Sequence, residues 1–363
     1  MRKIFFSFTL LSLIFATQLQ ASEQTLSQFI RSNAVHYWSY VKNSLGPNKL
    51  ENYLKYDGIV TGDPHPGNFS VALVKTAAGR RDMQFVNIDL DDAGRGPLVL
   101  DFVRLVIAIE SIGKPIKKRD LEEAYVNGLN KRRMAPPEDV RKLLAMSVSD
   151  YEKLVDKYVD DKTTQQGFKF KPGKIEPYTN TKISRATISQ LFPHDRVVDL
   201  ALRPGERGGS ASALRIWVLV EDRSKRRRII ELKQYQSPGI ASYQRQPPIE
   251  QWIAEVNAAI RPGLDPSTYD LIQVPGAGPF WIREKKAPLI DIPYSSDDEK
   301  KVTFLRELSL YDANFLGLIH GRQSQGVDYR NAIQADRETF HQATEELVKT
   351  YLKLAKEAME KAQ

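Results

Sequence analysis

The feature that most restricts the fold of this chain is the segment 61–69, which reads Thr-Gly-Asp-Pro-His-Pro-Gly-Asn-Phe. Its two prolines and two glycines exclude a helix, because proline has a fixed φ and no backbone N–H and glycine favours turns. We therefore predict a stiff loop from which Asp63 and Asn68 project. A second polar loop, residues 87–94, follows a short predicted strand and carries Asp89. An ordinary turn between strands would explain the first loop alone, but the two loops together favour a functional site.

The chemistry of these side chains is that of a site for a divalent cation and phosphate groups. One carboxylate can orient a nucleophile, while an amide oxygen and a second carboxylate hold the cation against the transferring phosphates. Oxygen ligands suit Mg²⁺, and the chain has no cysteine, which excludes disulfides, thiolate metal sites and thiol nucleophiles. The spacing of Asp63 and Asn68 is the D-x-x-x-x-N of a kinase catalytic loop.

Residues 1–21 are predicted to form a secretory signal peptide. Arg2 and Lys3 precede an apolar run at residues 4–16, and Ala21 supplies a small residue before the expected cut. The run is too short to span a bilayer comfortably, and we find no later stretch that could. We expect a periplasmic or secreted protein with no membrane span after signal cleavage. A retained N-terminal anchor is the alternative.

The chain has a formal net charge of +8, which favours anionic partners without identifying one. Its densest basic run, residues 225–228, lies between two apolar segments that read as strands. We interpret the run as a solvated hairpin turn rather than a nucleic-acid surface, and we expect no nucleic-acid partner.

The periodicity of apolar residues divides the chain into an α+β protein with two lobes. Residues 22–190 are mainly helical and contain both polar loops, and residues 191–292 are rich in β-like runs, which predicts a small antiparallel sheet. Residues 293–363 are helical again and are expected to pack back on the helical domain.

The β-rich domain has its own candidate phosphate-binding residues. Gly208, Gly209 and Ser210 lie in a Gly-rich stretch between two strands, where small residues let backbone N–H groups approach phosphate oxygens. Taken alone, the stretch favours a plain Gly-rich hairpin, because such hairpins are common. In the following strand Glu231 and Lys233 are two residues apart, which predicts that they share one face, and this lysine could pair with phosphate oxygens. A helix predicted over 248–260 offers Glu250 or Glu255 as the carboxylate that holds this lysine. The spacing does not choose between the two glutamates.

Two longer motifs resemble known families. Residues 62–68 are similar to the H-G-D-x-H-x-x-N loop of aminoglycoside phosphotransferases, with Thr61 in place of the motif's first histidine. Gly-Asp-x-His-x-x-Asn-Phe, Asp-x-Asp-Asp-Ala-Gly-x-Gly-Pro and Asp-Phe-x-Arg-Leu at residues 101–105 together resemble the bacterial domain-of-unknown-function family twenty-two fifty-two, which is kinase-like. The resemblance extends over roughly residues 28–330 and is more specific in its first half.

The resemblance implies a bilobal protein-kinase-like fold and a set of roles. It implies Asp63 as the base, Asn68 and Asp89 as Mg²⁺ ligands and Lys233 on the phosphates of ATP or another nucleotide. Asp101 is implied to be a structural partner of the catalytic loop, and we also expect His65 to be structural. Because Lys233 follows Asp63 in the sequence, whereas the lysine of a kinase precedes the catalytic loop, the chain is predicted to be circularly permuted.

Three functions are compatible with these residues. The first is an exported phosphotransferase or Mg²⁺-dependent nucleotide-binding protein with an unidentified substrate. Such an enzyme needs a phosphoryl donor outside the cytoplasm, where no ATP pool is expected. The second is a non-catalytic kinase-like module that binds a partner. The third is a metal-dependent phosphoesterase, because Gly-Asp-x-His also occurs in binuclear metallophosphatases, although such enzymes need several histidine ligands and this chain has five histidines in all.

Overall fold

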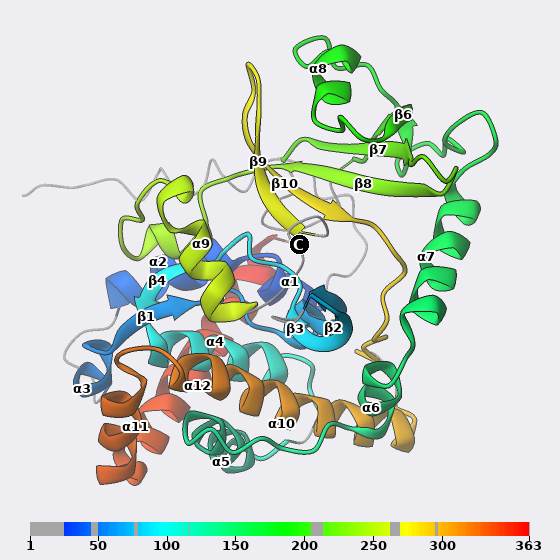
Figure 1. The fold of residues 1–363 in the computed structure, drawn as a ribbon. Coiled ribbons are helices and arrows are strands. Elements are labelled where there is room, and N and C mark those ends of the chain that lie inside the picture. Colours follow the sequence, from blue (N-terminus) through cyan, green and yellow to red (C-terminus); the bar gives the residue numbers. More distant parts are fainter. Residues whose placement is uncertain are drawn as a thin grey trace, which may run out of the picture.

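The computed structural model describes residues 25–44, 50–75, 79–114, 116–204, 213–261, 269–294 and 297–362. The predicted signal peptide and the candidate residues Gly208, Gly209 and Ser210 lie outside the described residues. The described part is an α+β structure in which a helical lobe lies below a six-stranded sheet (Figure 1).

The helical lobe is built around α4 (Leu98–Glu110), in which every residue except the last is buried. A helix that is apolar on all sides must be covered on all sides. The helices of this lobe are α1 (Leu26–Arg31), α2 (Ala34–Ser44), α3 (Glu51–Leu54), α5 (Lys118–Leu129), α6 (Glu138–Leu144), α7 (Val148–Lys162), α10 (Glu299–Gly321), α11 (Gly326–Ala335) and α12 (Arg337–Ala362).

The last helices of the chain pack on this lobe. The helix α10 lies against α5, and the two backbones approach closely at Gly128 and Gly317. A side chain at Gly128 would collide with the carbonyl of Asn314, so glycine permits the contact. Among the described helices we find none that combines the length and the apolar character of a membrane span.

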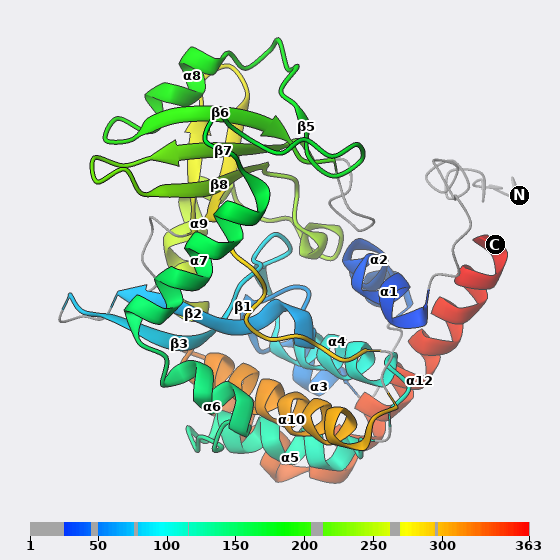
Figure 2. The same ribbon diagram turned by 90° about the vertical axis from the view of Figure 1, so that its right-hand side faces the viewer.

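The second lobe is an antiparallel sheet with the strand order β5-β6-β7-β8-β10-β9. Its elements are β5 (Glu176–Pro177), α8 (Arg185–Gln190), β6 (Arg196–Leu202), β7 (Arg215–Glu221), β8 (Arg227–Gln234), the 3₁₀ turn η2 (Gly239–Ser242), α9 (Ile249–Ile260), β9 (Tyr269–Val274) and β10 (Gly278–Glu284). The short strand β5 lies in a stretch that contains Gly167, Pro172, Gly173 and Pro177, and it pairs with β6. Figure 2 shows α7 and the segment after β10 running between the two lobes.

Two small antiparallel pairs fix the polar loops in the helical lobe. One joins β1 (Asp57–Val60) to β4 (Gly94–Pro97), and the other joins β2 (Phe69–Lys75) to β3 (Arg81–Asn87). The first polar loop runs from β1 to β2 through the 3₁₀ turn η1 (Pro66–Asn68), and the second runs from β3 to β4. Since Phe69 pairs with Asn87, and the Ile88 N–H donates to the Asn68 carbonyl at 2.8 Å, the two loops lie side by side.

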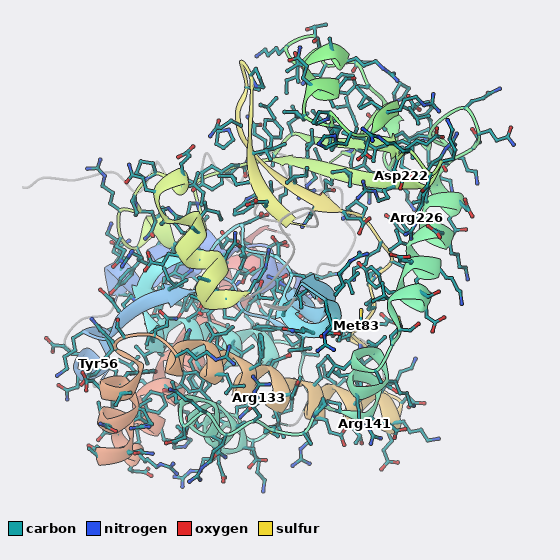
Figure 3. The ribbon with its side chains drawn as sticks, in the orientation of Figure 1. Tyr56, Met83, Arg133, Arg141, Asp222 and Arg226 are labelled. Atoms are coloured by element: carbon teal, nitrogen blue, oxygen red, sulfur yellow. The ribbon has the colours of Figure 1, made fainter. Side chains whose placement is uncertain are left out.

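The basic run at residues 225–228 forms the predicted hairpin turn between β7 and β8 and the start of β8. Its cations are used in ion pairs: Arg226 contacts Asp156 of α7 at 2.9 Å, and Arg228 contacts Asp195 at 2.9 Å. Figure 3 shows Asp222 and Arg226 at this end of the hairpin, next to α7. The turn therefore connects the sheet to a helix of the other lobe.

Candidate functional site

Asp101, in the first turn of α4, anchors the backbone of the loop that carries Asp63. The fully buried Asp101 carboxylate accepts hydrogen bonds from the backbone N–H groups of Thr61 at 2.8 Å and Gly62 at 2.9 Å. His320 Nε2 lies 3.2 Å from the same carboxylate. Charge-assisted bonds of this kind are the stronger ones in proteins. The contacts agree with the structural role that the resemblance implies for Asp101.

Asp63 itself pairs with Arg104, one turn further along α4. The Arg104 Nε and Nη2 atoms donate to Asp63 Oδ1 at 2.9 and 2.7 Å, and Nη2 also donates to the Ile30 carbonyl. Burial opposes the charge on Arg104, but the Asp63 carboxylate outweighs it and raises the pKa of this guanidinium. The expected base is thus an oriented carboxylate in a buried ion pair.

His65 stabilises the turn of the same loop. Its Nδ1 accepts the Gly67 N–H at 3.1 Å, which leaves Nε2 as the protonated nitrogen of the neutral ring, 3.8 Å from Asp63 Oδ2. Burial lowers the pKa of His65 to about 4, although the Asp63 carboxylate acts in the opposite direction. A neutral histidine that accepts a backbone hydrogen bond fits the structural role predicted for it.

Asn68, in the 3₁₀ turn η1, makes a hydrogen bond to each of the two polar loops. Its Nδ2 donates to the Asp63 carbonyl at 2.9 Å, which fixes the amide in the 3₁₀ turn. Through the backbone contact of Asn68 with Ile88, the structure brings Asn68 and Asp89 onto neighbouring loops. The backbone contact therefore places two predicted metal ligands, about twenty residues apart in the sequence, on adjacent loops.

Lys233, on β8 of the sheet lobe, reaches the second polar loop. Its Nζ is in direct ion contact with the Asp91 carboxylate, and it also acts electrostatically on Asp89. The Lys233 side chain is only 3% exposed. Burial lowers the pKa of Lys233 to about 8, against the opposing effect of Asp89. Burial alone would raise the pKa of Asp89, but Lys233 and Arg283 outweigh it and hold that pKa below its ordinary value.

A second buried network lies next to Lys233 on the same face of the sheet. Glu231 accepts hydrogen bonds from Trp217 Nε1 at 3.0 Å and from Arg283 Nε at 2.5 Å. Arg283 also lies 3.8 Å from Asp89. Burial opposes the charge of Glu231, yet Arg283 and Lys285 lower the pKa of this carboxyl to about 2. Glu231 and Lys233 thus share a face, as their alternation predicts, but each has its own partner.

The expectation that a glutamate of α9 holds Lys233 is not met. Glu250 accepts a hydrogen bond from Gln273 at 2.7 Å, and Glu255 pairs with Arg95 at 2.5 Å. The helix buries its stripe of Ile249, Trp252, Val256 and Ile260, and both glutamates lie off this stripe and are exposed. The partner that the structure gives Lys233 is Asp91.

Sequence reasoning assigned no role to Asp91, Arg104 or Arg283. Asp91 and Arg104 belong to the motifs Asp-x-Asp-Asp and Asp-Phe-x-Arg-Leu that support the resemblance, so a signal for both was present. Arg283 lies on β10, and its proximity to Asp89 depends on strand pairing between β8 and β10. That pairing is not visible in the local sequence.

The carboxylate oxygens at and near Asp89 are ligand atoms that suit a hard cation. Asp89 Oδ1 and Asp91 Oδ1 are buried and have no hydrogen-bond partner in the described structure. Within the described residues no group of three or more His, Cys, Asp or Glu side chains is arranged around a common metal position. Mg²⁺ in phosphate-transfer sites takes one or two carboxylates and completes its shell with water and phosphate oxygens, so two carboxylates and an amide are a suitable set.

The histidines do not form a cluster of the kind that a binuclear phosphoesterase needs. His36 contacts Tyr351, His320 contacts Asp101 and Tyr125, and His341 contacts Glu122. These positions belong to three different helices and are engaged with partners of their own. The geometry gives the phosphoesterase hypothesis no support from histidine ligands.

Comparisons of the chain with protein-family models, with curated proteins and with solved structures found no match.

Proposed function

We propose that this protein is a kinase-like phosphotransferase, or a Mg²⁺-dependent nucleotide-binding protein, with a circularly permuted bilobal fold. The observation that carries the proposal is the contact of Lys233 with the segment that contains Asp89 and Asp91. These residues are far apart in the sequence and come from different lobes. A lysine beside an acidic metal loop is the arrangement that binds nucleotide phosphates and their cation.

The order of elements supports the permutation. Lys233 lies on β8, the third of the long antiparallel strands β6, β7 and β8, which the two-residue strand β5 precedes, and α9 follows before β9 and β10 complete this part of the sheet. In protein kinases the phosphate-binding lysine is likewise on the third strand, with a helix after it. Here this unit follows the catalytic-type loop, and the segment after β10 leads into α10 of the helical lobe.

In this proposal Asp63 orients the acceptor, Asn68 and Asp89 hold Mg²⁺, and Lys233 moves from Asp91 to the phosphates of the donor. Mg²⁺ would supply charge neutralisation on the transferring phosphate. The protein is proposed to act in the periplasm or outside the cell.

A non-catalytic binding module is the second candidate, and the buried Asp63–Arg104 pair favours it. Asp63 Oδ1 already accepts two hydrogen bonds from the buried Arg104 guanidinium, so this carboxylate holds the loop in place, which is a role that a binding module also needs. In this case substitution of Asp63 would leave ligand binding and the cellular phenotype unchanged.

The test is calorimetric titration of the mature protein with ATP and ADP, with and without Mg²⁺. We expect Mg²⁺-dependent binding that weakens about tenfold or more in Asp89→Asn and Lys233→Met, because each loses a charged contact with the metal–phosphate unit. Lys153→Gln, which removes an exposed cation of α7, is the matched control and should bind as the wild type does. No nucleotide binding by the wild-type protein would overturn the proposal.

A further inference from the structure

A cavity of about 260 Å³ lies between the β2–β3 hairpin and the segment that follows β10. Its volume is close to the lower end of the range of small-molecule pockets, about 300–1,000 Å³. Phe69, Leu73, Val86 and Ile290 contribute apolar walls. The polar side chains of its lining are mainly hydrogen-bond donors. This excess of donors over acceptors indicates that the cavity suits a ligand with acceptor groups.

Asn87 is the most informative donor. The residue is fully buried, and its Oδ1 accepts the Asp89 N–H at 2.9 Å, which fixes the orientation of the amide. Its Nδ2 is buried, lies in a residue that lines the cavity, and has no hydrogen-bond partner in the described structure. A buried donor without a partner costs roughly 1–3 kcal/mol, so an acceptor that enters the cavity would recover this cost.

Two lysines add positive charge to the same lining. Lys286 Nζ lies 3.4 Å from the Val71 carbonyl and 5.4 Å from the centre of the Tyr151 ring, whereas Lys285 lies 3.7 Å from the Glu231 carboxylate. Burial is the main cause that lowers the pKa of each lysine to about 8. Arg261 and Arg283 also line the cavity.

The acidic side chains nearby balance this charge only in part. Glu231 is engaged by Arg283 and Trp217, outside the lining. Glu284 is the acidic residue of the lining itself, and burial raises its pKa. Partly buried lysines next to an unsatisfied buried amide donor favour an anion over a neutral ligand.

We propose that this cavity binds a small organic oxyanion, a carboxylate or phosphate ester attached to an apolar or aromatic body. The oxyanion accepts from Asn87 Nδ2 and lies near Lys285 and Lys286, and the body packs against Phe69, Leu73 and Ile290. This inference goes beyond the proposed nucleotide chemistry, because binding here requires neither Mg²⁺ nor Lys233. A neutral nucleobase is the competing occupant.

The experiment is calorimetric titration of the mature full-length protein in EDTA, with four probes. Phenyl phosphate and benzoate carry the oxyanion, benzyl alcohol has the same body without charge, and adenosine presents a neutral nucleobase. We expect at least one of the two anions to bind, and benzyl alcohol and adenosine to bind at least tenfold more weakly. The anion that binds more tightly shows whether the cavity prefers a carboxylate or a phosphate ester.

Two variants locate the binding. Asn87→Asp keeps the acceptor for the Asp89 N–H but replaces the free donor with an oxygen, and Lys286→Gln removes a cation from the other side of the cavity. We expect each to weaken anion binding about tenfold or more, with Lys153→Gln unchanged. Lys286→Gln keeps the test valid if Asn87→Asp does not fold.

Three results would overturn the inference: no binding of either anion, binding of adenosine or benzyl alcohol as tight as that of the anions, or anion binding unaffected by Lys286→Gln. Failure of the Mg²⁺–nucleotide titration would leave this result untouched, since the probes are titrated without metal.

Discussion

Arg104 Nη2 lies 2.7 Å from Asp63 Oδ1, and the Arg104 side chain is completely buried beneath the loop that carries Asp63. The same guanidinium donates to the Ile30 carbonyl at the end of α1, so one side chain connects the loop, α4 and the first helix. Asp101, one turn earlier in α4, holds the backbone of the same loop. Asp101 and Arg104 of α4 therefore fix the position of Asp63.

The first prediction concerns this ion pair. Arg104→Met should lower the free energy of unfolding by about 3–5 kcal/mol, because it leaves the Asp63 carboxylate buried without its charged partner. Asp63→Asn/Arg104→Met should recover part of this loss, since no uncompensated charge remains. Urea unfolding followed by circular dichroism measures both.

Arg119→Met is the matched control for the loss of an arginine. Arg119 pairs with Glu338 on the surface, with side chains 69% and 60% exposed, and such pairs contribute at most about 1 kcal/mol. Equal effects of the Arg104 and Arg119 substitutions would show that the buried pair does not stabilise the loop.

The second prediction concerns Lys233 and Asp91. Each of Lys233→Met and Asp91→Asn should destabilise the protein, and the double variant should lose about 1–3 kcal/mol less than the sum of the single losses, because the side chains are in direct contact. A double-mutant cycle of urea unfolding measures this coupling. A cycle on Lys142 and Glu138, an exposed pair in α6, is the reference and should give a coupling of about 0.5 kcal/mol or less. Additive losses at Lys233 and Asp91 would contradict the contact.

The third prediction is a pH dependence that arises from His65. Burial lowers the pKa of His65 from 6.5 to about 4, so between these values the unfolded chain binds the proton more strongly than the folded protein does. His65 therefore destabilises the fold progressively as the pH falls from 6.5 to 4, by roughly 3 kcal/mol in total.

His65→Asn isolates this effect, because the asparagine Oδ1 can accept the Gly67 N–H but does not titrate. Relative to the variant, the wild type should lose stability between pH 6.5 and pH 4 and show no such relative loss above pH 7. Denaturant unfolding at several pH values measures the difference, and His194→Asn, at an exposed position, controls for the removal of a histidine. Parallel pH profiles of wild type and His65→Asn would refute the assignment.

The local parts of the site were predictable because they depend on residues close together in the chain. Pro64 and Pro66 exclude an α-helix, and the five-residue spacing of Asp63 and Asn68 on a stiff loop lets the Asn68 amide donate to the Asp63 backbone carbonyl. The alternation of Glu231 and Lys233 likewise predicts their common face of β8.

The partners of these residues were not predictable in the same way. An amphipathic pattern in α9 leaves Glu250 and Glu255 as equal candidates for Lys233, whereas the packing of Trp252 and its neighbours turns both glutamates to the surface. Arg283 approaches Asp89 because β10 pairs with β8 in one register. Such contacts join residues that only the assembled sheet brings together.

The sequence by itself determined the mixture of helices and antiparallel strands, the two polar loops and the candidate residues on them, since turn chemistry and apolar periodicity act over a few residues. Only the tertiary structure decided that Lys233 pairs with Asp91, that Arg104 holds Asp63, and that Asn87 and two lysines line one cavity. The reason is that a buried charge or donor selects its partner from whatever side chain the packing of distant elements brings within reach.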